Sequence, residues 1–499
     1  MKLGALLAQA KIPLPDAAAD IDVRAIAYDS RKVKPGSLFV AVPGFHRDGT
    51  DFVLAAIANG AVAIVVERPV PADVPVAVVP DTRAALADLS AEFFDHPTRT
   101  LKIAAVTGTD GKTTTVHLVS DVLAAAGERT GYATTVDFKL ADHEWQNDTR
   151  QSTQEALELQ EFCAELLVAG GTWGVLEATS HALALRKIRN IDVDVAVFTN
   201  ITPEHLDFHA TLQEYLRAKG ILFEMLTQGL DKGVPKTAVL NADDPHWRYL
   251  ADRAAGARVI SYGIDALADV QAAILAADAN GSRIKITAGG ESVELQLPLV
   301  GRFNVHNALA ATGAGLAAGA TLAQCRDALA TAVPVRGRMD RIDAGQPFTV
   351  IVDYAHTPES LEKVLALLRP LTAGKLIAVF GSAGERDKTK RPKLAAVASK
   401  YADRFFITQE DPRLEDPAAI LAEIEAGAVE AGKQRDRDYQ VIEDRTAAIN
   451  AAIADAGEGD TVLLAGKGHE GSIIVGEEKL PWDEAGAARA ALRARGFAE

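Results

Sequence analysis

The sequence feature that most constrains the fold is a glycine-rich segment placed between an apolar run and a helical period. The run Lys102–Val106 has the composition of a buried β-strand, and the stretch after Thr115 has the spacing of an amphipathic helix. Between them lies TGTDGKTTT, Thr107–Thr115. The order of strand, glycine-rich loop and helix is typical of α/β proteins that bind phosphate at the start of a helix.

The residue types in this loop indicate what it binds. Gly108 and Gly111 allow backbone N–H groups to turn toward an anion, Lys112 can reach the β- and γ-phosphates, and Thr113 can ligate Mg²⁺. The standard phosphate-loop pattern has a glycine at position 106, where this chain has Val106. A glycine-rich turn without a ligand is the alternative, but Gly-Lys-Thr at a helix start favours a nucleoside triphosphate site.

The rest of the chain alternates short β-rich runs with Ala/Leu-rich helical periods, which predicts α/β domains throughout. Polar, proline-bearing segments near residues 95–100 and 333–341 predict two boundaries, and hence domains at 1–99, 100–334 and 335–499. We expect the last domain to be a Rossmann-like parallel sheet. The expected strands and helices include Ser37–Val42, Asp51–Gly60, Ala61–Glu67, Thr82–Phe94, Gly174–Glu177 and Asn307–Gly319, and in the last domain the runs FTVIVDY, KLIAVFG, RFFIT, YQVI and TVLLAG.

Bulk composition excludes some classes of partner. The 499 residues carry a formal net charge of −16, which would repel nucleic acid and anionic membranes, so we expect neither as a partner. Cys163 and Cys325 are the only cysteines and have no metal-type spacing, which indicates a reducing compartment. The N-terminus lacks a signal-peptide pattern, and no apolar run is long enough to span a bilayer. We expect a monomeric protein of the cytoplasm.

Several further segments, in order along almost the whole chain, carry a resemblance to a known family. They are DSRKVKPGSLFVAVPGFHRDG (29–49), TGTDGKTT (107–114), LEATSHAL (176–183), FTNITPEHLDFHATLQEYLRAK (198–219), GRFNVHNALAA, GRMD, VDYAHTPESL, GERDKTKRP and AGKGHE. Together they resemble the Mur ligase family, and within it the MurE type, which adds the third residue of the peptidoglycan peptide. The resemblance implies three domains: a uridine-nucleotide domain, a phosphate-loop ATPase domain and an amino-acid domain.

The family's reaction uses ATP to join a carboxylate to an amine. The resemblance implies that the γ-phosphoryl group moves to the carboxylate of UDP-MurNAc-L-Ala-D-Glu, that the resulting acyl phosphate is attacked by the amine of a diamino acid, and that phosphate leaves. Such catalysis consists mainly of positioning and of stabilising charge between two anionic reactants. The implied partners are therefore small molecules.

The resemblance also implies which residues bind ATP and metal. Lys112, Glu177, His205 and Lys219 take catalytic roles, and Thr113, Glu177, His205 and a carbamate formed from Lys219 and CO₂ support Mg²⁺. For His205 a packing role is the alternative, although acidic and imidazole groups crowd its segment, EHLDFH; for Lys219 it is a solvated helix position. The implied ATP contacts are Gly108, Thr109, Asp110, Gly111, Lys112, Thr113, Thr114, Asn307, Arg338 and Asp353.

The nucleotide-peptide substrate has its own set of implied contacts. They are Tyr28, Ser30, Phe45, His46, Arg47, Ser152, Thr153, Thr179, Leu185 and Lys187. Lys187 stands where the family usually has an arginine, and only arginine grips a carboxylate with a planar pair of N–H groups. Either the grip is looser here, or the preceding Arg186 replaces it. A solvated basic helix edge is the alternative for this run.

The amino-acid contacts implied by the resemblance are Arg386, Glu410, Asp411, Pro412, Arg413, Gly466 and Glu470. Family members that select meso-diaminopimelate carry Asp-Asn-Pro-Arg, where this chain has Glu410-Asp411-Pro412-Arg413. The retained arginine favours a substrate with a second carboxylate. The extra negative charge of Asp411 would suit an additional ammonium group and hence lysine or ornithine, unless Asp411 belongs to an ordinary polar turn. We favour meso-diaminopimelate and leave lysine and ornithine open.

Two other functions are compatible with parts of the sequence. A ligase of the same fold acting on a folate or poly-glutamate chain would not need the uridine-nucleotide segment 29–49. A non-catalytic nucleotide-binding regulator would have lost catalytic positions, whereas Lys112, Glu177, His205, Lys219 and Glu470 are all present. Both alternatives are therefore disfavoured.

Overall fold

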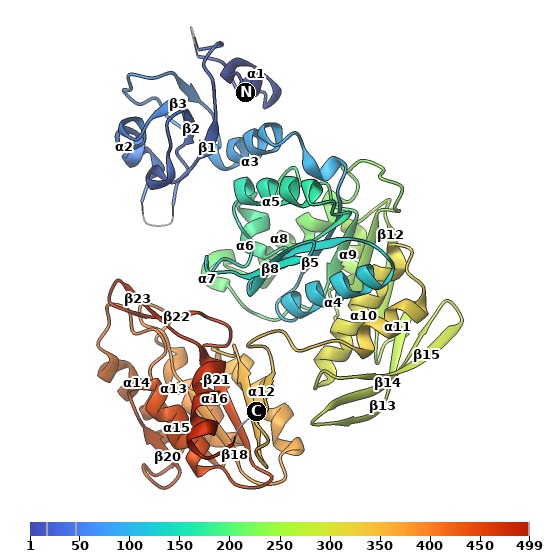
Figure 1. Cartoon of the computed structure of the whole chain (residues 1–499), viewed down its shortest axis with the longest axis vertical. Coiled ribbons are helices and arrows are strands. Elements are labelled where there is room, and N and C mark those ends of the chain that lie inside the picture. Colours follow the sequence, from blue (N-terminus) through green and yellow to red (C-terminus); the bar gives the residue numbers. More distant parts are fainter. Residues whose placement is uncertain (16–17, 45–46, 498–499) are drawn as a thin grey trace.

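The chain builds three main sheets in sequence order, together with one isolated hairpin (Figure 1). The computed structural model describes residues 1–15, 18–44 and 47–497, and for residues 206 and 207 the backbone only. This agrees with the α/β class expected from the alternating pattern. Within the described residues, no helix combines the length and the apolar character that a bilayer-crossing segment requires.

The first sheet has four parallel strands in the order β1-β2-β3-β4. Apolar side chains on its two faces form separate small cores, one of them against α1 and α3 and the other against α2. Its elements are α1 (Leu3–Gln9), β1 (Ala25–Ala27), η1 (Ser30–Lys32), β2 (Ser37–Val40), η2 (Gly49–Phe52), α2 (Val53–Ala58), β3 (Ala61–Val66), β4 (Val76–Val78), α3 (Thr82–Phe93) and η3 (Pro97–Arg99).

The second sheet has 11 strands in the order β15-β14-β13-β12-β11-β10-β5-β9-β6-β7-β8. Its parallel centre is covered by α4, α10 and α11 on one face and by α5 and α8 on the other. Its strands are β5 (Lys102–Thr107), β6 (Thr130–Ala133), β7 (Asp137–Leu140), β8 (His143–Gln146), β9 (Trp173–Glu177), β10 (Val195–Phe198), β11 (Thr237–Asn241), β12 (Arg258–Gly263), β13 (Val270–Asp278), β14 (Gly281–Ala288) and β15 (Glu291–Leu297).

Each main sheet and its helices are called a unit below, and the second is also the central unit. Its helices are α4 (Lys112–Ala125), α5 (Ala156–Val168), α6 (Ser180–Ala184), α7 (Leu206–His209), α8 (Leu212–Met225), α9 (Trp247–Arg253), α10 (Arg302–Ala317) and α11 (Leu322–Ala330). Helix α10 starts five residues before the predicted Asn307. The expected strands of this unit did not include the antiparallel additions, β7-β8 at one edge and β13-β14-β15 at the other. Strand β14 alternates buried and exposed residues, a weaker signal than the apolar runs of the parallel centre.

The third sheet has the order β16-β17-β21-β18-β19-β20, parallel except for β16, which confirms the Rossmann-like prediction apart from that edge strand. A separate hairpin, β22-β23, lies beside it. The elements are β16 (Asp340–Ile342), β17 (Thr349–Asp353), α12 (Pro358–Leu368), η4 (Arg369–Leu371), β18 (Leu376–Phe380), α13 (Lys390–Tyr401), β19 (Arg404–Ile407), α14 (Pro417–Glu430), β20 (Tyr439–Val441), α15 (Arg445–Asp455), β21 (Thr461–Ala465), β22 (Ser472–Val475), β23 (Glu478–Pro481) and α16 (Glu484–Ala494).

Candidate active site

The glycine-rich loop lies at the carboxyl end of β5, which is flanked by β10 and β9 in the middle of the central sheet. Ligands of α/β sheets bind at this end of the strands. Gly111 has φ +82°, and a Cβ there would lie 2.4 Å from Asn307 Oδ1. A Cβ on Gly108 would lie 1.8 Å from Thr199 Oγ1. Both positions therefore require glycine for the loop to keep its shape.

We predict that Gly111→Ala weakens nucleotide binding by at least about tenfold, because a left-handed alanine costs about 1–2 kcal/mol before its contact with Asn307 is counted. The dissociation constant of ADP, measured by calorimetry, checks this. Gly127→Ala is the matched control, since Gly127 has φ +90° but a Cβ at that position would have no atom within 4 Å. Equal loss of ADP affinity in both variants would contradict the prediction.

Lys112 begins α4 and curls back over the loop. Its Nζ donates to the carbonyl oxygens of Gly108 (3.1 Å) and Thr109 (2.8 Å). The next loop residue, Asp110, forms an ion pair of 2.5 Å with Lys363, which belongs to α12 of the third unit. Thr114 lies half-buried in the first turn of α4. The predicted ATP residues of the loop thus lie together at the start of α4. The Lys112 ammonium contacts the same stretch of backbone that would bind phosphate.

Glu177 ends β9 and faces the loop from the neighbouring strand. Its buried carboxylate accepts hydrogen bonds from Thr113 Oγ1 at 2.7 Å and from the backbone N–H of Thr135 at 2.8 Å. A hydroxyl and a carboxylate beside a phosphate loop are oxygen ligands of the kind that Mg²⁺ prefers, with substrate phosphates completing the set. Thr113 and Glu177 therefore fit the predicted magnesium site.

Lys219 lies on α8 and is only 1% exposed, so the alternative of a solvated helix lysine is wrong. Its Nζ donates to the carbonyl of Gly108 at 2.7 Å and lies 4.3 Å from the centre of the Tyr215 ring. Burial, with a smaller effect from the charge of Lys112, lowers the pKa of Lys219 well below its usual value. The Lys219 amine therefore contacts the backbone of the phosphate loop.

His205 has a left-handed backbone (φ 57°), and its Nε2 lies 3.8 Å from Glu204 Oε2. Its ring centre is 4.7 Å from that of His181, which indicates packing contacts. Among the side chains that the structure describes, no three His, Cys, Asp or Glu residues converge to hold a metal ion. The metal role of His205 therefore remains a prediction.

The three other predicted ATP contacts lie on separate elements. Asn307 of α10 accepts a hydrogen bond from Thr115 Oγ1 at 3.3 Å, which ties it to the start of α4. Arg338 stacks 4.6 Å above the ring of Tyr354, and its Nε is buried with no hydrogen-bond partner among the described residues. Asp353 accepts from two backbone N–H groups, and burial raises the pKa of its carboxyl.

Residues predicted for the nucleotide-peptide substrate lie partly at the junction of the first and second units. Tyr28 Oη donates to Glu158 of α5 at 2.7 Å. Ser30 is buried in η1, and Arg47 is exposed. Phe45 and His46 lie outside the described residues.

The remainder of that set lies near the end of β9. Thr153 Oγ1 donates to the carbonyl of Glu177 at 2.9 Å and to Thr179 Oγ1 at 3.3 Å. The half-buried residues Ser152 and Leu185 lie beside them in the chain, next to Thr153 and just after α6. The loop that carries Ser152 and Thr153 is therefore attached to the strand that carries the predicted metal ligand.

The structure separates the two basic residues that the sequence left as alternatives. Lys187 Nζ contacts this same loop, with Gln151 Oε1 at 3.1 Å, the Thr153 carbonyl at 3.4 Å and Glu155 at 2.8 Å. Arg186 instead pairs with Asp81 at 2.7 Å, at the start of α3 in the first unit. Arg186 is therefore paired away from this loop, and a substrate contact of Lys187 stays a prediction.

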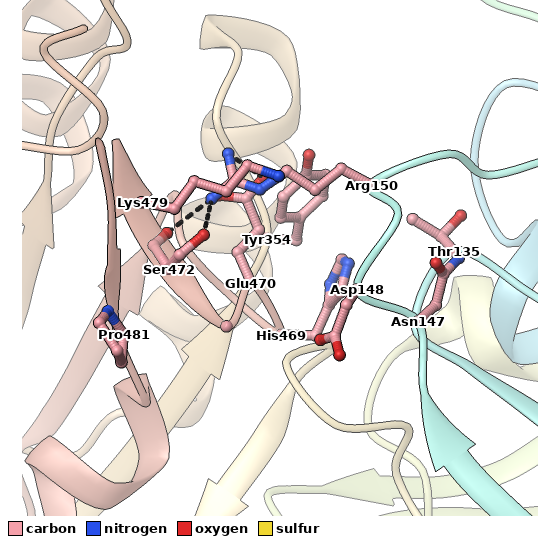
Figure 2. Close-up of a pocket in the computed structure, with 11 residues that line it drawn as sticks. Thr135, Asn147, Asp148, Arg150, Tyr354, His469, Glu470, Ser472, Lys479 and Pro481 are labelled. Atoms are coloured by element: carbon pink, nitrogen blue, oxygen red, sulfur yellow. Dashed lines mark hydrogen bonds and ion pairs between the residues drawn. The ribbon is translucent and has the colours of Figure 1, made fainter. Parts of the chain in front are cut away.

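A cavity of about 280 Å³ lies between the central and third units (Figure 2). The first wall is the loop after β8, which carries Arg150. The opposite wall includes the segment 469–472 and the hairpin β22-β23, and the Arg150 side chain extends toward it. Glu470, one of the predicted amino-acid contacts, lines the cavity. The lining residues are Thr135, Asn147, Asp148, Arg150, Tyr354, His469, Glu470, Gly471, Ser472, Lys479 and Pro481.

The predicted amino-acid residues gather on neighbouring loops of the third sheet. Gly466 has φ +104°, and a Cβ there would lie 3.0 Å from the buried Glu410 Oε2. Pro412 is buried, and Arg413 follows with φ 55° and a buried Nε that has no hydrogen-bond partner among the described residues. Arg386 is exposed on the loop before α13. A buried guanidinium N–H without a partner suits an anionic ligand.

Asp411 is only 3% exposed and already has cationic partners. It accepts hydrogen bonds from Lys467 Nζ (2.8 Å), Arg150 Nη1 (2.8 Å) and the N–H of Ile474 (3.0 Å). Burial alone would raise the pKa of its carboxyl, but Lys467 and the other donors hold it below the usual value. Asp411 is therefore not an ordinary polar turn residue, and its charge needs no further ammonium group.

Sequence reasoning missed four contributors to the site: Thr135, Arg150, Lys363 and Lys467. Lys467 was within reach, because it lies inside the motif AGKGHE, and Arg150 directly precedes the stretch Gln151–Thr153. Nothing in the spacing of Thr135 or Lys363 indicated a role, because their partners Glu177 and Asp110 lie 42 and 253 residues away in the chain.

Comparisons with known proteins agree with this geometry. Three family models match the chain: "Mur ligase family, catalytic domain" at residues 22–94, "Mur ligase middle domain" at 106–315 and "Mur ligase, glutamate ligase domain" at 337–468. A UDP-N-acetylmuramyl-tripeptide synthetase of Roseiflexus sp. is 50% identical over 95% of this chain and 96% of its own. The chain belongs to the Mur ligase family.

Other relatives carry a more specific name. The UDP-N-acetylmuramoyl-L-alanyl-D-glutamate–2,6-diaminopimelate ligase of Geobacillus thermodenitrificans is 45% identical over 95% of this chain and 96% of its own. A solved structure of a ligase of that name is 30% identical, with a TM-score of 0.69 over 99% of this chain and 100% of that one. This Mur ligase is thus an ATP-dependent amide-bond ligase with the three-domain architecture of its family.

Proposed function

We propose that this Mur ligase adds a diamino acid, with meso-2,6-diaminopimelate favoured, to UDP-MurNAc-L-Ala-D-Glu during peptidoglycan precursor synthesis. The observation that carries the proposal is the cavity between the central and third units. One of its walls is the loop that leads into Ser152 and Thr153, and the other carries Glu470. This arrangement supports a nucleotide-peptide bound at the first wall and an amine held at the second. The names of the diaminopimelate ligases among the relatives support the same pair of substrates.

The proposed division of labour follows the three units. Residues 1–99 bind the uridine nucleotide, 100–334 bind ATP and 335–499 bind the amino acid. Lys112 moves from the loop carbonyls to the phosphates once ATP is bound, and Lys187 steers the acidic peptide toward the loop that carries Thr153. We propose a monomer that works in the cytoplasm on small molecules, without nucleic acid or stable membrane contact.

Magnesium and a modified lysine belong to the same proposal. Thr113 and Glu177 would hold Mg²⁺, with His205 as a further ligand, and the ion would offset the negative charge between phosphate and carboxylate. We propose that the Lys219 amine adds to CO₂ and loses a proton, so that a buried cation becomes a carbamate anion. The burial of Lys219 beside Gly108 supports this, because burial disfavours the charged ammonium and the charge of Lys112 disfavours it further.

The side-chain chemistry favours diaminopimelate over lysine or ornithine. The buried Arg413 Nε has no partner among the described residues and suits the distal carboxylate that only diaminopimelate carries. Asp411, whose extra charge would otherwise suit a terminal ammonium, is matched by Lys467 and Arg150. Glu470 and Glu410 remain as candidates to accept from the α-ammonium group.

Phosphate release from ATP with UDP-MurNAc-L-Ala-D-Glu tests the proposal, with diaminopimelate, lysine and ornithine compared at equal concentration. We expect release with all substrates present and the highest kcat/KM with meso-diaminopimelate, accompanied by a tripeptide product seen by mass spectrometry. Phosphate release with lysine or ornithine but not with diaminopimelate would show that the favoured amino acid is wrong. Absence of release with all three would refute the proposed function.

A further inference from the structure

Arg150 makes the main polar contact between the two walls of the cavity. Its Nη1 donates to Asp411 Oδ2 at 2.8 Å. Its Nη2 donates to the carbonyl oxygen (2.7 Å) and Oγ (2.6 Å) of Ser472 (Figure 2). Nη1 also lies 3.9 Å from Glu470 Oε1. The side chain is 22% exposed, and its partners lie 261 and 322 residues away in the chain. One guanidinium thus spans two units.

The arginine is held in place from its own side as well. Residue 150 has a left-handed backbone (φ 58°), and Asn147 Nδ2 donates to the carbonyls of Thr134 (2.7 Å) and Gln151 (2.9 Å) on either side of the loop. Three residues farther on, Thr153 is bonded to the end of β9. A shift of Arg150 would therefore be passed to Ser152 and Thr153.

Its partner Asp411 is occupied on both oxygens. Oδ1 accepts from Lys467 and Ile474, while Oδ2 accepts from Arg150. An asparagine has a single acceptor oxygen, so its amide group would face either the lysine or the arginine with N–H groups. Lys467 in turn bonds Glu470 at 2.5 Å, so the same carboxylate supports the predicted amino-acid contact.

We propose that Arg150 is a positioning residue that joins the loop of the nucleotide-peptide substrate to the amino-acid pocket, and that Asp411 is an aspartate in order to hold it. This inference rests on the proposed function. The contact closes the cavity wall around the incoming amine and keeps Glu470 aligned with the loop that carries Thr153. Asp411 accordingly serves the assembly of the pocket and does not select among diamino acids.

A double-mutant cycle tests this with Arg150→Met, Asp411→Asn and the combined variant, assayed by phosphate release with each of the three amino acids. We expect kcat/KM for the preferred amino acid to fall about 30-fold in Arg150→Met and about 10-fold in Asp411→Asn. The double variant should lose about 30-fold, far less than the product of the two effects, because both changes break one contact. The KM of ATP and the melting temperature should stay unchanged.

Two further variants and one second measurement complete the test. Arg150→Lys should recover part of the activity, since an ammonium can reach Asp411 but cannot also bond Ser472. Arg129→Met, which removes an exposed pair with Asp142, is the matched control and should behave as wild type. Hydrogen exchange of the Ile474 amide, which bonds Asp411, should quicken in Arg150→Met.

The outcomes separate this inference from the function on which it rests. Wild-type enzyme that releases no phosphate with any of the amino acids would overturn both. If the wild type is active, any of three results would overturn the inference alone. Arg150→Met could have unchanged activity, or the losses could be additive in the double variant. The third is a rise in the KM of ATP by the same factor as the fall in kcat/KM for the amino acid. So would a change of preferred amino acid in Asp411→Asn.

Discussion

Lys219→Ala is expected to lower the rate of phosphate release by about 10³-fold, with recovery when formate or acetate is added. The wild-type side chain lies buried under the phosphate loop with its Nζ 2.7 Å from the Gly108 carbonyl. Removing it takes away the proposed carbamate and leaves a space that a short carboxylate can enter to restore the negative charge. Rates at increasing formate concentration, with wild type in parallel, measure the effect.

The control for this experiment lies on the same helix. Arg217 is exposed on α8, so Arg217→Ala keeps the helix and the buried site and should retain wild-type activity with no response to formate. A Lys219→Ala variant that is fully active without added carboxylate would exclude the carbamate. Loss of activity without rescue, at an unchanged melting temperature, would assign Lys219 a direct role as a cation.

Arg445→Met is expected to destabilise the third unit by about 3–5 kcal/mol, the largest stability effect that we predict. Arg445 and Glu484 are both fully buried and share three hydrogen bonds of 2.6–3.2 Å. Arg445 also donates to the carbonyls of Gln409 and Ala465, and Trp482 Nε1 donates to Glu484. Removing the cation would leave a carboxylate in the core without its main partner.

Hydrogen exchange of the β17, β18 and β21 amides measures this effect locally, which is preferable in a chain with three units. Arg437→Met is the control, because Arg437 pairs with Asp438 at the surface and its loss should leave the free energy of opening unchanged. The double variant Arg445→Met/Glu484→Met should recover much of the loss, since no charge is left buried. Equal protection in Arg445→Met and wild type would show that the pair contributes no net stability.

Arg445 also illustrates how much of the site was accessible from sequence. Its carbonyl partners Gln409 and Ala465 directly precede Glu410 and Gly466, so the buried pair supports two predicted amino-acid contacts. The motifs located those contacts, but no spacing rule joined an arginine at 445 to a glutamate at 484. Sequence reasoning proposed residues for substrate contact and did not find the buried pair that supports them.

What the sequence determined by itself is local in the chain. The phosphate loop follows from a strand, two glycines and a helix start within about fifteen residues, because the backbone conformation that binds phosphate is set by neighbours in sequence. The α/β class and the parallel third sheet follow in the same way from apolar periodicity. The ordered motifs then identified the family that the comparisons confirm.

The tertiary structure alone decided which charges meet. It paired Asp411 with Lys467 and Arg150, and it placed Lys187 rather than Arg186 at the loop that carries Thr153. Arg150 and Asp411 come from different units, and Asp411 and Lys467 follow different strands of one sheet, so their distances depend on how packed elements are oriented, which residue spacing does not encode. Asp411, whose charge the sequence offered as one match for an ammonium group, is in the folded chain paired with cations from two units.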